Sequence, residues 1–193
     1  SSTMLAKVET ANILDRPGTD RMATLDHGFG PRFLVTIDTE EEFDWSAPIA
    51  REANSTAAAP RMAEFQTFCE ARGVSPVWLV DWPIANSTEA QAILRHAAAA
   101  GKAEIGLHLH PWVSPPFDEE VSQFNSFAGN LPAELEREKL ARLHQAIEAN
   151  LGVRPRIYRA GRYGAGPATA AILTELGYAI DTSVRAHFDY SAE

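Results

Sequence analysis

Strand-like and helix-like segments alternate along this chain between residues 32 and 183. The strand-like segments are short and rich in β-branched, leucine and aromatic residues. The helix-like segments repeat apolar side chains at helical spacing, and several end on glycine. Such alternation builds a parallel sheet with right-handed crossovers, either an open doubly wound sheet or a barrel. The expected strands are 32–38, 74–81, 103–110, 154–161 and 178–183, and the expected helices are 60–73, 86–101, 131–152 and 166–177.

Length and composition limit the possible classes of protein. The 193 residues suit one domain, and we expect residues 1–31 to form an N-terminal arm and 32–193 the α/β domain. A net charge of −9, with no basic stripe, argues against nucleic acid as a partner. The single cysteine, Cys69, excludes an internal disulfide and a cysteine-rich zinc site. With no signal peptide and no apolar run of about 18 residues, we expect no membrane partner and a cytoplasmic protein, with a processed or cell-envelope form as the alternative.

Polar residues stand where each expected strand ends. In a parallel α/β fold, the carboxyl ends of the strands share one edge, and functional sites collect there. An ordinary core does not require a carboxylate, imidazole or guanidinium at every one of these ends. The residues are Asp38 and Glu40, Asp81, His108 and His110, Arg159, and Asp181.

The stretch "TIDTEEEFDW" (36–45) supplies the carboxylates of the first strand end. Asp38 and Glu40 are two residues apart, so an extended chain places them on the same side. Because Asp38 directly follows a buried strand, where an unpaired carboxylate is costly, a functional role is favoured. The alternative is that the whole acidic run is a solvated loop.

The stretch "EIGLHLHPW" (104–112) carries two histidines at the same spacing. His108 and His110 share one side of the third strand, and carboxylates from the first strand complete a mixed nitrogen and oxygen set. Such a set suits zinc, iron or cobalt. The alternative is an ordinary polar strand end.

Arginines and aromatic residues follow the other strand ends. In "YRAGRYGAG" (158–166), Arg159 either pairs with a rim carboxylate or belongs to a plain glycine-rich turn. Asp181 is a further partner or a capping aspartate. Four aromatic residues lie after strand ends at this same edge. They serve either as packing residues or as flat surfaces that stack on sugars. They are Trp45, Trp82, Trp112 and Tyr163.

The order Asp38, His108, Arg159, Asp181 resembles that of the polysaccharide deacetylase family, the NodB-homology domain of carbohydrate esterase family 4 (CE4). The resemblance covers roughly residues 32–190, and it is nearest to the branch whose second motif reads HLHPW. It implies a distorted (β/α) barrel that uses a divalent metal to remove N- or O-acetyl groups from sugars. The family's last motif, Leu-x-x-His, supplies the general acid and has no counterpart before Glu193. We therefore expect a barrel that is incomplete at its C-terminus, through truncation or degeneration.

The resemblance also implies roles for individual residues. "TIDTE" stands where the family has Thr-Phe-Asp-Asp-Gly, so Asp38 matches the general base. The second, metal-binding aspartate falls on Thr39, which Glu40 would replace. His108 matches the first metal histidine. Trp112 stands in the place of the second one, so that His110 would substitute.

Arg159 matches the residue that braces the base, and Asp181 resembles the fourth motif. We therefore predict a metal-dependent hydrolase acting on an acetylated carbohydrate. Its cofactor would be a divalent metal, with zinc expected and cobalt, iron or nickel as alternatives. Two other functions stay open. One is a sugar-binding pseudoenzyme, and the other is an amidohydrolase, in which an HxH pair usually lies on the first strand.

Overall fold

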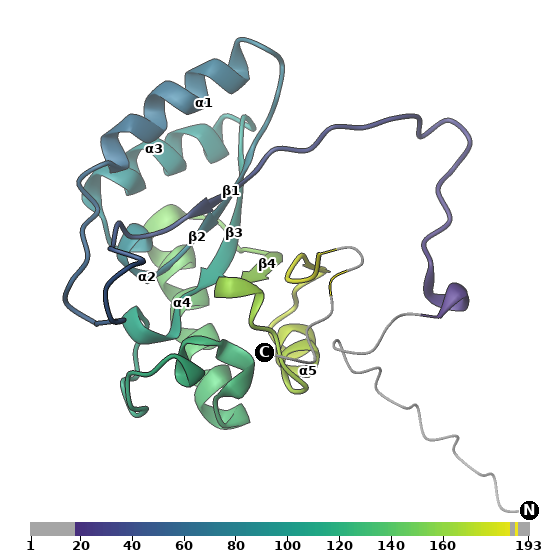
Figure 1. The fold of residues 1–193 in the computed structure, drawn as a ribbon. Helices are drawn as coiled ribbons and strands as arrows, with labels where there is room; N and C mark the ends of the chain where they lie inside the picture. Colours follow the sequence, from purple (N-terminus) through teal and green to yellow (C-terminus); the bar gives the residue numbers. More distant parts are fainter. Residues whose placement is uncertain (1–17, 186–187, 189–193) are drawn as a thin grey trace, which may run out of the picture.

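One sheet of five parallel strands organises the computed structural model, which describes residues 18–185 and residue 188 (Figure 1). Neighbouring strands are parallel and follow one another in sequence order. The strands are β1 (Thr36–Thr39), β2 (Val77–Val80), β3 (Glu104–Leu109), β4 (Ile157–Ala160) and β5 (Ile180–Asp181). The helices are α1 (Met62–Glu70), α2 (Trp82–Ala85), α3 (Thr88–Ala99), α4 (Ala133–Leu151) and α5 (Thr169–Glu175).

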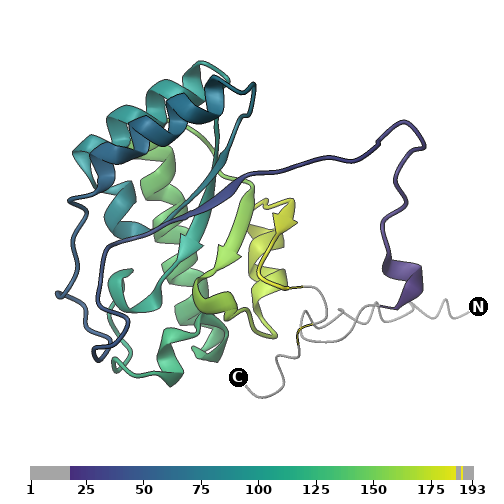
Figure 2. The same cartoon turned by 45° about the horizontal axis from the view of Figure 1, so that its top comes forward.

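The sequential strand order decides between the two α/β architectures. A doubly wound sheet reverses its strand order at a switch point, whereas this sheet does not. Right-handed crossovers between successive neighbours place the helices on one face, as in a (β/α) barrel. Helices α3 and α4 pack on β3 and α1 packs on α3, and the three helices lie on the same side of the sheet (Figure 2). The expected barrel-type α/β fold is confirmed.

The sheet is strongly curved, and one side-chain contact shows it. In a flat sheet β4 would lie about 14 Å from β1, three strand spacings away. Side chains that stand perpendicular to such a sheet could not meet across it. Nevertheless, Nη1 of Arg159 on β4 lies 2.6 Å from Oδ1 of Asp38 on β1. The sheet therefore has a concave face on which strands far apart in order approach each other.

The first strand is shorter than expected. We predicted a buried strand over 32–38, but β1 begins at Thr36, and Phe33 and Leu34 are 84% and 80% exposed. The reason is its neighbour, because pairing with β2 begins at Thr36 opposite Val77. Residues before that point have no neighbouring strand in the described part of the chain.

Helix α2 is an element that the sequence did not predict. Asp81, at the end of β2, starts it by accepting a hydrogen bond from the backbone N–H of Ile84 through Oδ1 at 3.0 Å. A carboxylate at this position satisfies one of the free N–H groups of the first turn. Asp81 is fully buried, so its strand-end position serves the fold directly.

The core lies between the sheet and α4. Along α4, Leu140, Leu143 and Ile147 follow at helical spacing and are fully buried. They pack in the same cluster as Leu107 and Leu109 of β3. Strand β3 is thus buried among helices on one face, while His108 and His110, the residue directly after the strand, point toward the concave face.

The segment before β1 lies apart from the core. Residues 18–34 are all exposed and run away from the sheet (Figure 2), while residues 1–17 of the predicted arm lie outside the described residues. In the part of the chain that the structure describes, no helix is both long enough and apolar enough to cross a lipid bilayer.

Candidate metal and catalytic site

Three expected metal ligands converge at the carboxyl end of the sheet. Glu40 follows β1, and His108 and His110 lie at the end of β3. Oε2 of Glu40 is 3.2 Å from Nε2 of His108 and 3.2 Å from Nε2 of His110. The ligand atoms of all three residues lie within 4.8 Å of one another. The structure thus brings together the three residues that the family resemblance implies as metal ligands.

The hydrogen bond of His108 shows which atom faces this cluster. Its Nδ1 lies 3.0 Å from the backbone carbonyl oxygen of Arg159, the residue opposite it on β4. A carbonyl can only accept, so Nδ1 carries the proton. In the neutral ring, Nε2 then presents a lone pair to the carboxylate of Glu40.

His110 presents a second nitrogen to the same point. Its ring is fully buried, and among the residues described none offers Nε2 a hydrogen bond. A buried nitrogen without a partner is costly unless something else binds it. Two imidazole nitrogens and a carboxylate oxygen that converge in this way fit a divalent cation, and zinc accepts such ligands. The residues present therefore fit the expected metal.

The charge state of Glu40 supports the same chemistry. Burial alone would raise the pKa of this carboxyl, but the neighbouring His108 and His110 lower it to about 2. Glu40 is therefore ionised at neutral pH and able to serve as a ligand. Thr39, where the family's aspartate falls, is buried and donates its hydroxyl to the carbonyl of Ile37 at 3.0 Å.

Glu41 is a residue of this site that the sequence missed. In the acidic run it could have been solvated, yet it is 2% exposed, and its Oε2 lies 2.9 Å from Nδ1 of His110. Its N–H donates to Oδ2 of Asp81 at 2.9 Å. Burial raises the pKa of both carboxyl groups. Only the alternation of Glu40 and Glu41 along an extended chain could have indicated their opposite environments.

Asp38 lies beside this cluster and is held by Arg159. The guanidinium donates to Oδ1 of Asp38 at 2.6 Å, and it is itself fixed by Thr36 at 3.0 Å and by Thr182 at 3.1 Å. Asp38 keeps about a third of its side chain exposed. The arrangement is a braced, solvent-accessible carboxylate.

Asp181 is not brought to this group. It is paired in register with Tyr158, whose side chain points away from the face that carries Arg159. Its Oδ1 accepts hydrogen bonds from the backbone and hydroxyl of Ser183. Burial raises its pKa. The structure shows Asp181 as a turn-stabilising residue, and a catalytic role for it stays a prediction.

The four aromatic residues occupy different environments. Trp45 is 59% exposed, and its ring centroid lies 6.5 Å from that of His110. Trp112 is buried and stacks on His110 at 4.3 Å, so it packs behind the histidine. Trp82 is half-buried in the first turn of α2. Tyr163 is half-buried and has a φ of 57°.

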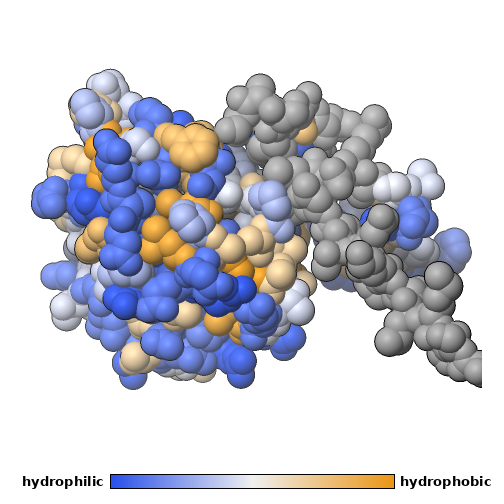
Figure 3. Space-filling model, turned by 90° about the horizontal axis from the view of Figure 1, so that it is seen from below, coloured by the Kyte–Doolittle hydropathy of each residue, from blue (hydrophilic) through white to orange (hydrophobic). Residues whose placement is uncertain are grey.

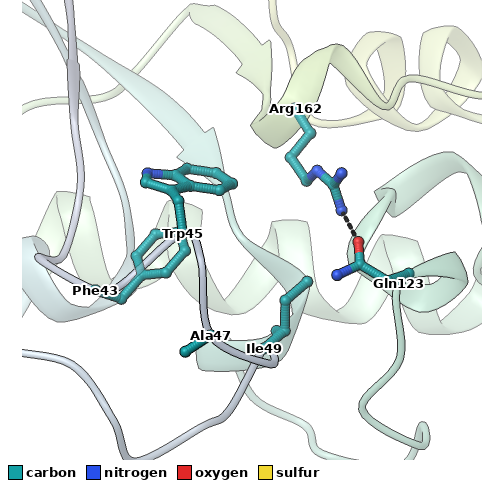
Figure 4. Close-up of a pocket in the computed structure, with 6 residues that line it drawn as sticks. All are labelled: Phe43, Trp45, Ala47, Ile49, Gln123 and Arg162. Carbon is teal, nitrogen blue, oxygen red and sulfur yellow. Dashed lines mark hydrogen bonds between the residues drawn. The ribbon is translucent and has the colours of Figure 1, made fainter.

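A small pocket of about 60 Å³ opens beside Trp45 (Figure 4). Arg162 lies across it from Trp45 and donates a hydrogen bond to Gln123 at 2.8 Å. The remaining lining residues are Phe43, Ala47 and Ile49. The loops that follow β3 lie below the sheet in Figure 1, and from that side apolar groups gather between hydrophilic ones (Figure 3).

A glycine after β4 lets the chain approach the histidine. A Cβ added to Gly161 would lie 2.4 Å from Cδ2 of His110 and 2.5 Å from the carbonyl oxygen of Leu109. The next two residues, Arg162 and Tyr163, both have left-handed φ angles, 55° and 57°. Such backbone strain occurs often at functional sites.

Comparison with solved structures identifies the fold that carries this site. No family model matches the sequence, and no curated protein matches it. Among solved structures, the chain is similar to the Xyl-CE4 domain of a multidomain xylanase from the hindgut metagenome of Trinervitermes trinervoides. The TM-score is 0.51 and the identity 14%, over 76% of this chain and 55% of that one. The fold is that of the CE4 polysaccharide deacetylases.

Two further structures with the CE4 fold are similar. The chitin deacetylase of Colletotrichum lindemuthianum gives a TM-score of 0.50 at 16% identity, over 77% of this chain and 53% of that one. A mutant of BA3943, a CE4 family pseudoenzyme from Bacillus anthracis, gives 0.50 at 15% identity, over 77% and 43%. The chain spans less than two thirds of the length of each of these three structures.

Proposed function

We propose that this chain carries the active site of a metal-dependent hydrolase that removes acetyl groups from an acetylated sugar or polysaccharide. The observation that carries the proposal is the convergence of Oε2 of Glu40 with the Nε2 atoms of His108 and His110. It lies on the concave face of a sheet with the CE4 fold, beside a carboxylate that Arg159 braces.

The metal would be held by Glu40, His108 and His110. When bound, a divalent cation such as zinc supplies Lewis acidity to the acetyl carbonyl and to water. Both histidines are already oriented by the protein. The carbonyl of Arg159 fixes His108, and Glu41 lies against the far nitrogen of His110.

Asp38 would act as the base. It takes a proton from the water that attacks the acetyl carbon, and Arg159 keeps its carboxylate aimed and charged. The bond from the acetyl carbon to nitrogen or oxygen then breaks, and the leaving group needs a proton. We assign the return of the proton to Asp38 as well.

Trp45 and its pocket would receive the sugar. An exposed indole beside the cluster offers a flat apolar face, and Phe43 supports it at a centroid distance of 4.2 Å. The flat faces of sugars stack on such rings. A role in sugar binding stays a prediction for Trp82, Trp112 and Tyr163. Trp112 would act indirectly, through its packing against His110.

Metal analysis and acetate release test the proposal together. The purified chain is dialysed against zinc and assayed on acetylated chitooligosaccharides and acetylated xylan, with and without a chelator. We expect stoichiometric zinc, acetate release that the chelator abolishes and zinc restores, and an Asp38→Asn variant that binds zinc without turnover. Asp44→Asn, an exposed carboxylate on the following loop, is the matched control. Zinc-free protein, or full activity of Asp38→Asn, would contradict the proposal.

The second candidate is a sugar-binding pseudoenzyme. Two substitutions favour it, Thr39 and Trp112 at positions where the family's pattern has metal ligands, and a CE4 pseudoenzyme is among the similar structures. It predicts glycan binding without acetate release at any zinc concentration. An amidohydrolase is less favoured, because the histidine pair lies at the end of β3 and not on the first strand.

A further inference from the structure

Glu41 is the buried carboxylate that the proposed reaction does not use. It has no substrate-facing surface, at 2% exposure, and its Oε2 lies 2.9 Å from Nδ1 of His110. A buried carboxylate is expensive to maintain, so a specific contact is expected to justify it.

Asp81 links Glu41 to helix α2. Oδ2 of Asp81 accepts the backbone N–H of Glu41 at 2.9 Å, and Oδ1 accepts the N–H of Ile84 at 3.0 Å. One carboxylate thus ties the chain after β1 to the first turn of α2. The position of Glu41 is therefore set by two elements of the fold.

The two ring nitrogens of His110 make different kinds of contact. Nδ1 meets Glu41 in a hydrogen bond, whereas the contact of Nε2 with Glu40, at 3.2 Å, lacks the direction of a hydrogen bond. We infer that Glu41, held by Asp81, is a positioning residue that keeps the proton of His110 on Nδ1 and its lone pair on Nε2, aimed at Glu40. A carboxylate behind a metal-binding histidine commonly has this role.

Of the described carboxylates around His110, Glu41 alone lies within hydrogen-bond distance of Nδ1, because Oδ2 of Asp81 is 4.0 Å from that nitrogen. Trp112 stacks on one face of the ring at an interplanar angle of 22°, and Phe43 meets it edge-on at 6.0 Å. Gly161 approaches the ring carbon Cδ2. These contacts fix the plane of the imidazole, but none of them accepts a proton from Nδ1.

The consequence for metal binding rests on the proposed function. Loss of the Glu41 carboxylate would let the proton move to Nε2, where it blocks the ligand. Removal of such a supporting carboxylate elsewhere weakens metal binding by roughly 10- to 100-fold.

The wild-type protein without metal supplies the first test. Two-dimensional ¹⁵N–¹H spectra of the histidine rings distinguish the two neutral tautomers and the imidazolium. We expect both His108 and His110 as Nδ1–H tautomers. A His110 ring protonated on Nε2, alone or together with Nδ1, would overturn the inference. This result stands whether or not zinc binds, so it separates the inference from the proposed function.

Variants supply the second test, read by zinc titration against a chromophoric chelator and by the same spectra. Glu41→Ala should weaken zinc binding by roughly 10- to 100-fold and mix the tautomers of His110 but not of His108. Glu41→Gln keeps an acceptor and should largely restore both readouts. Glu136→Gln, an equally buried carboxylate on α4, is the matched control and should bind zinc as the wild type does. Zinc affinity of Glu41→Ala within twofold of the wild type, with circular dichroism unchanged, would also overturn the inference.

Discussion

Arg159 contacts both halves of the candidate site through different atoms. Its side chain donates to Oδ1 of Asp38 at 2.6 Å, and its backbone carbonyl lies 3.0 Å from Nδ1 of His108. One residue of β4 therefore orients the expected base and an expected metal ligand. Because the second contact uses only the backbone, substitution can separate the two effects.

Arg159→Lys should lower kcat while it leaves zinc binding intact. Lysine keeps the charge but cannot reproduce the fork that reaches Asp38, Thr36 and Thr182. We expect kcat for acetate release to fall about 100-fold, the lower end of a general base's contribution. Arg137→Lys, on the outer face of α4, is the control. Weakened zinc binding at unchanged kcat would show that the assignment is wrong.

Gly161→Ala should disturb His110 directly. The added methyl group would lie 2.4 Å from Cδ2 of the ring and 2.5 Å from the carbonyl oxygen of Leu109, so the ring or the strand must move. We expect a loss of about 1–3 kcal/mol in the free energy of unfolding, as for an overpacked core, together with weaker zinc binding. Gly28→Ala meets nothing within 4 Å and serves as the control. Urea denaturation and zinc titration measure the two effects, and an unchanged zinc affinity would refute the steric argument.

Lys139 should be essential for stability. It is fully buried in α4, donates to backbone carbonyls within the segment 111–116, and pairs with Glu119 at 3.0 Å. Lys139→Met leaves Glu119 buried with less compensation, so we expect about 3–5 kcal/mol less stability in urea denaturation. Lys102→Met, at an exposed position, should cost little. A loss below 1 kcal/mol at Lys139 would mean that the segment after β3 is held by other contacts.

The alternation of segments was enough to predict the sheet, its parallel strands and the edge at which polar residues meet. Two-residue spacing also predicted which side chains of "TIDTE" and "HLH" share a side, and the structure brings Glu40, His108 and His110 together. These features follow from local periodicity, which a sequence displays directly.

Features that depend on a neighbouring element could not be predicted in this way. Glu41 is held in its buried position by Asp81, which follows β2 and accepts its N–H, and the exposure of Phe33 reflects where β2 begins. The need for Gly161 arises from the ring of His110, which follows β3 and lies far away in sequence. Each of these is a tertiary contact that leaves no mark on local spacing.

Glu136 should make the protein less stable as the pH rises. Burial in α4 raises the pKa of its carboxyl to about 7, although the Thr169 hydroxyl and Arg137 act to lower it. In the unfolded chain the group ionises near 4.5, so between about pH 4.5 and pH 7 the unfolded state binds fewer protons than the folded state. The stabilisation that the neutral carboxyl contributes is therefore fully present below pH 4.5, and it is lost as the pH rises through about 7.

Glu136→Gln removes this dependence and keeps an acceptor for Thr169. We expect the free energy of unfolding of the variant, relative to the wild type, to rise by about 2–3 kcal/mol between pH 5 and pH 8. Urea denaturation at three pH values measures it, with Glu138→Gln, exposed on the same helix, as the control. A constant difference between variant and wild type across this range would show that Glu136 is already ionised in the folded protein.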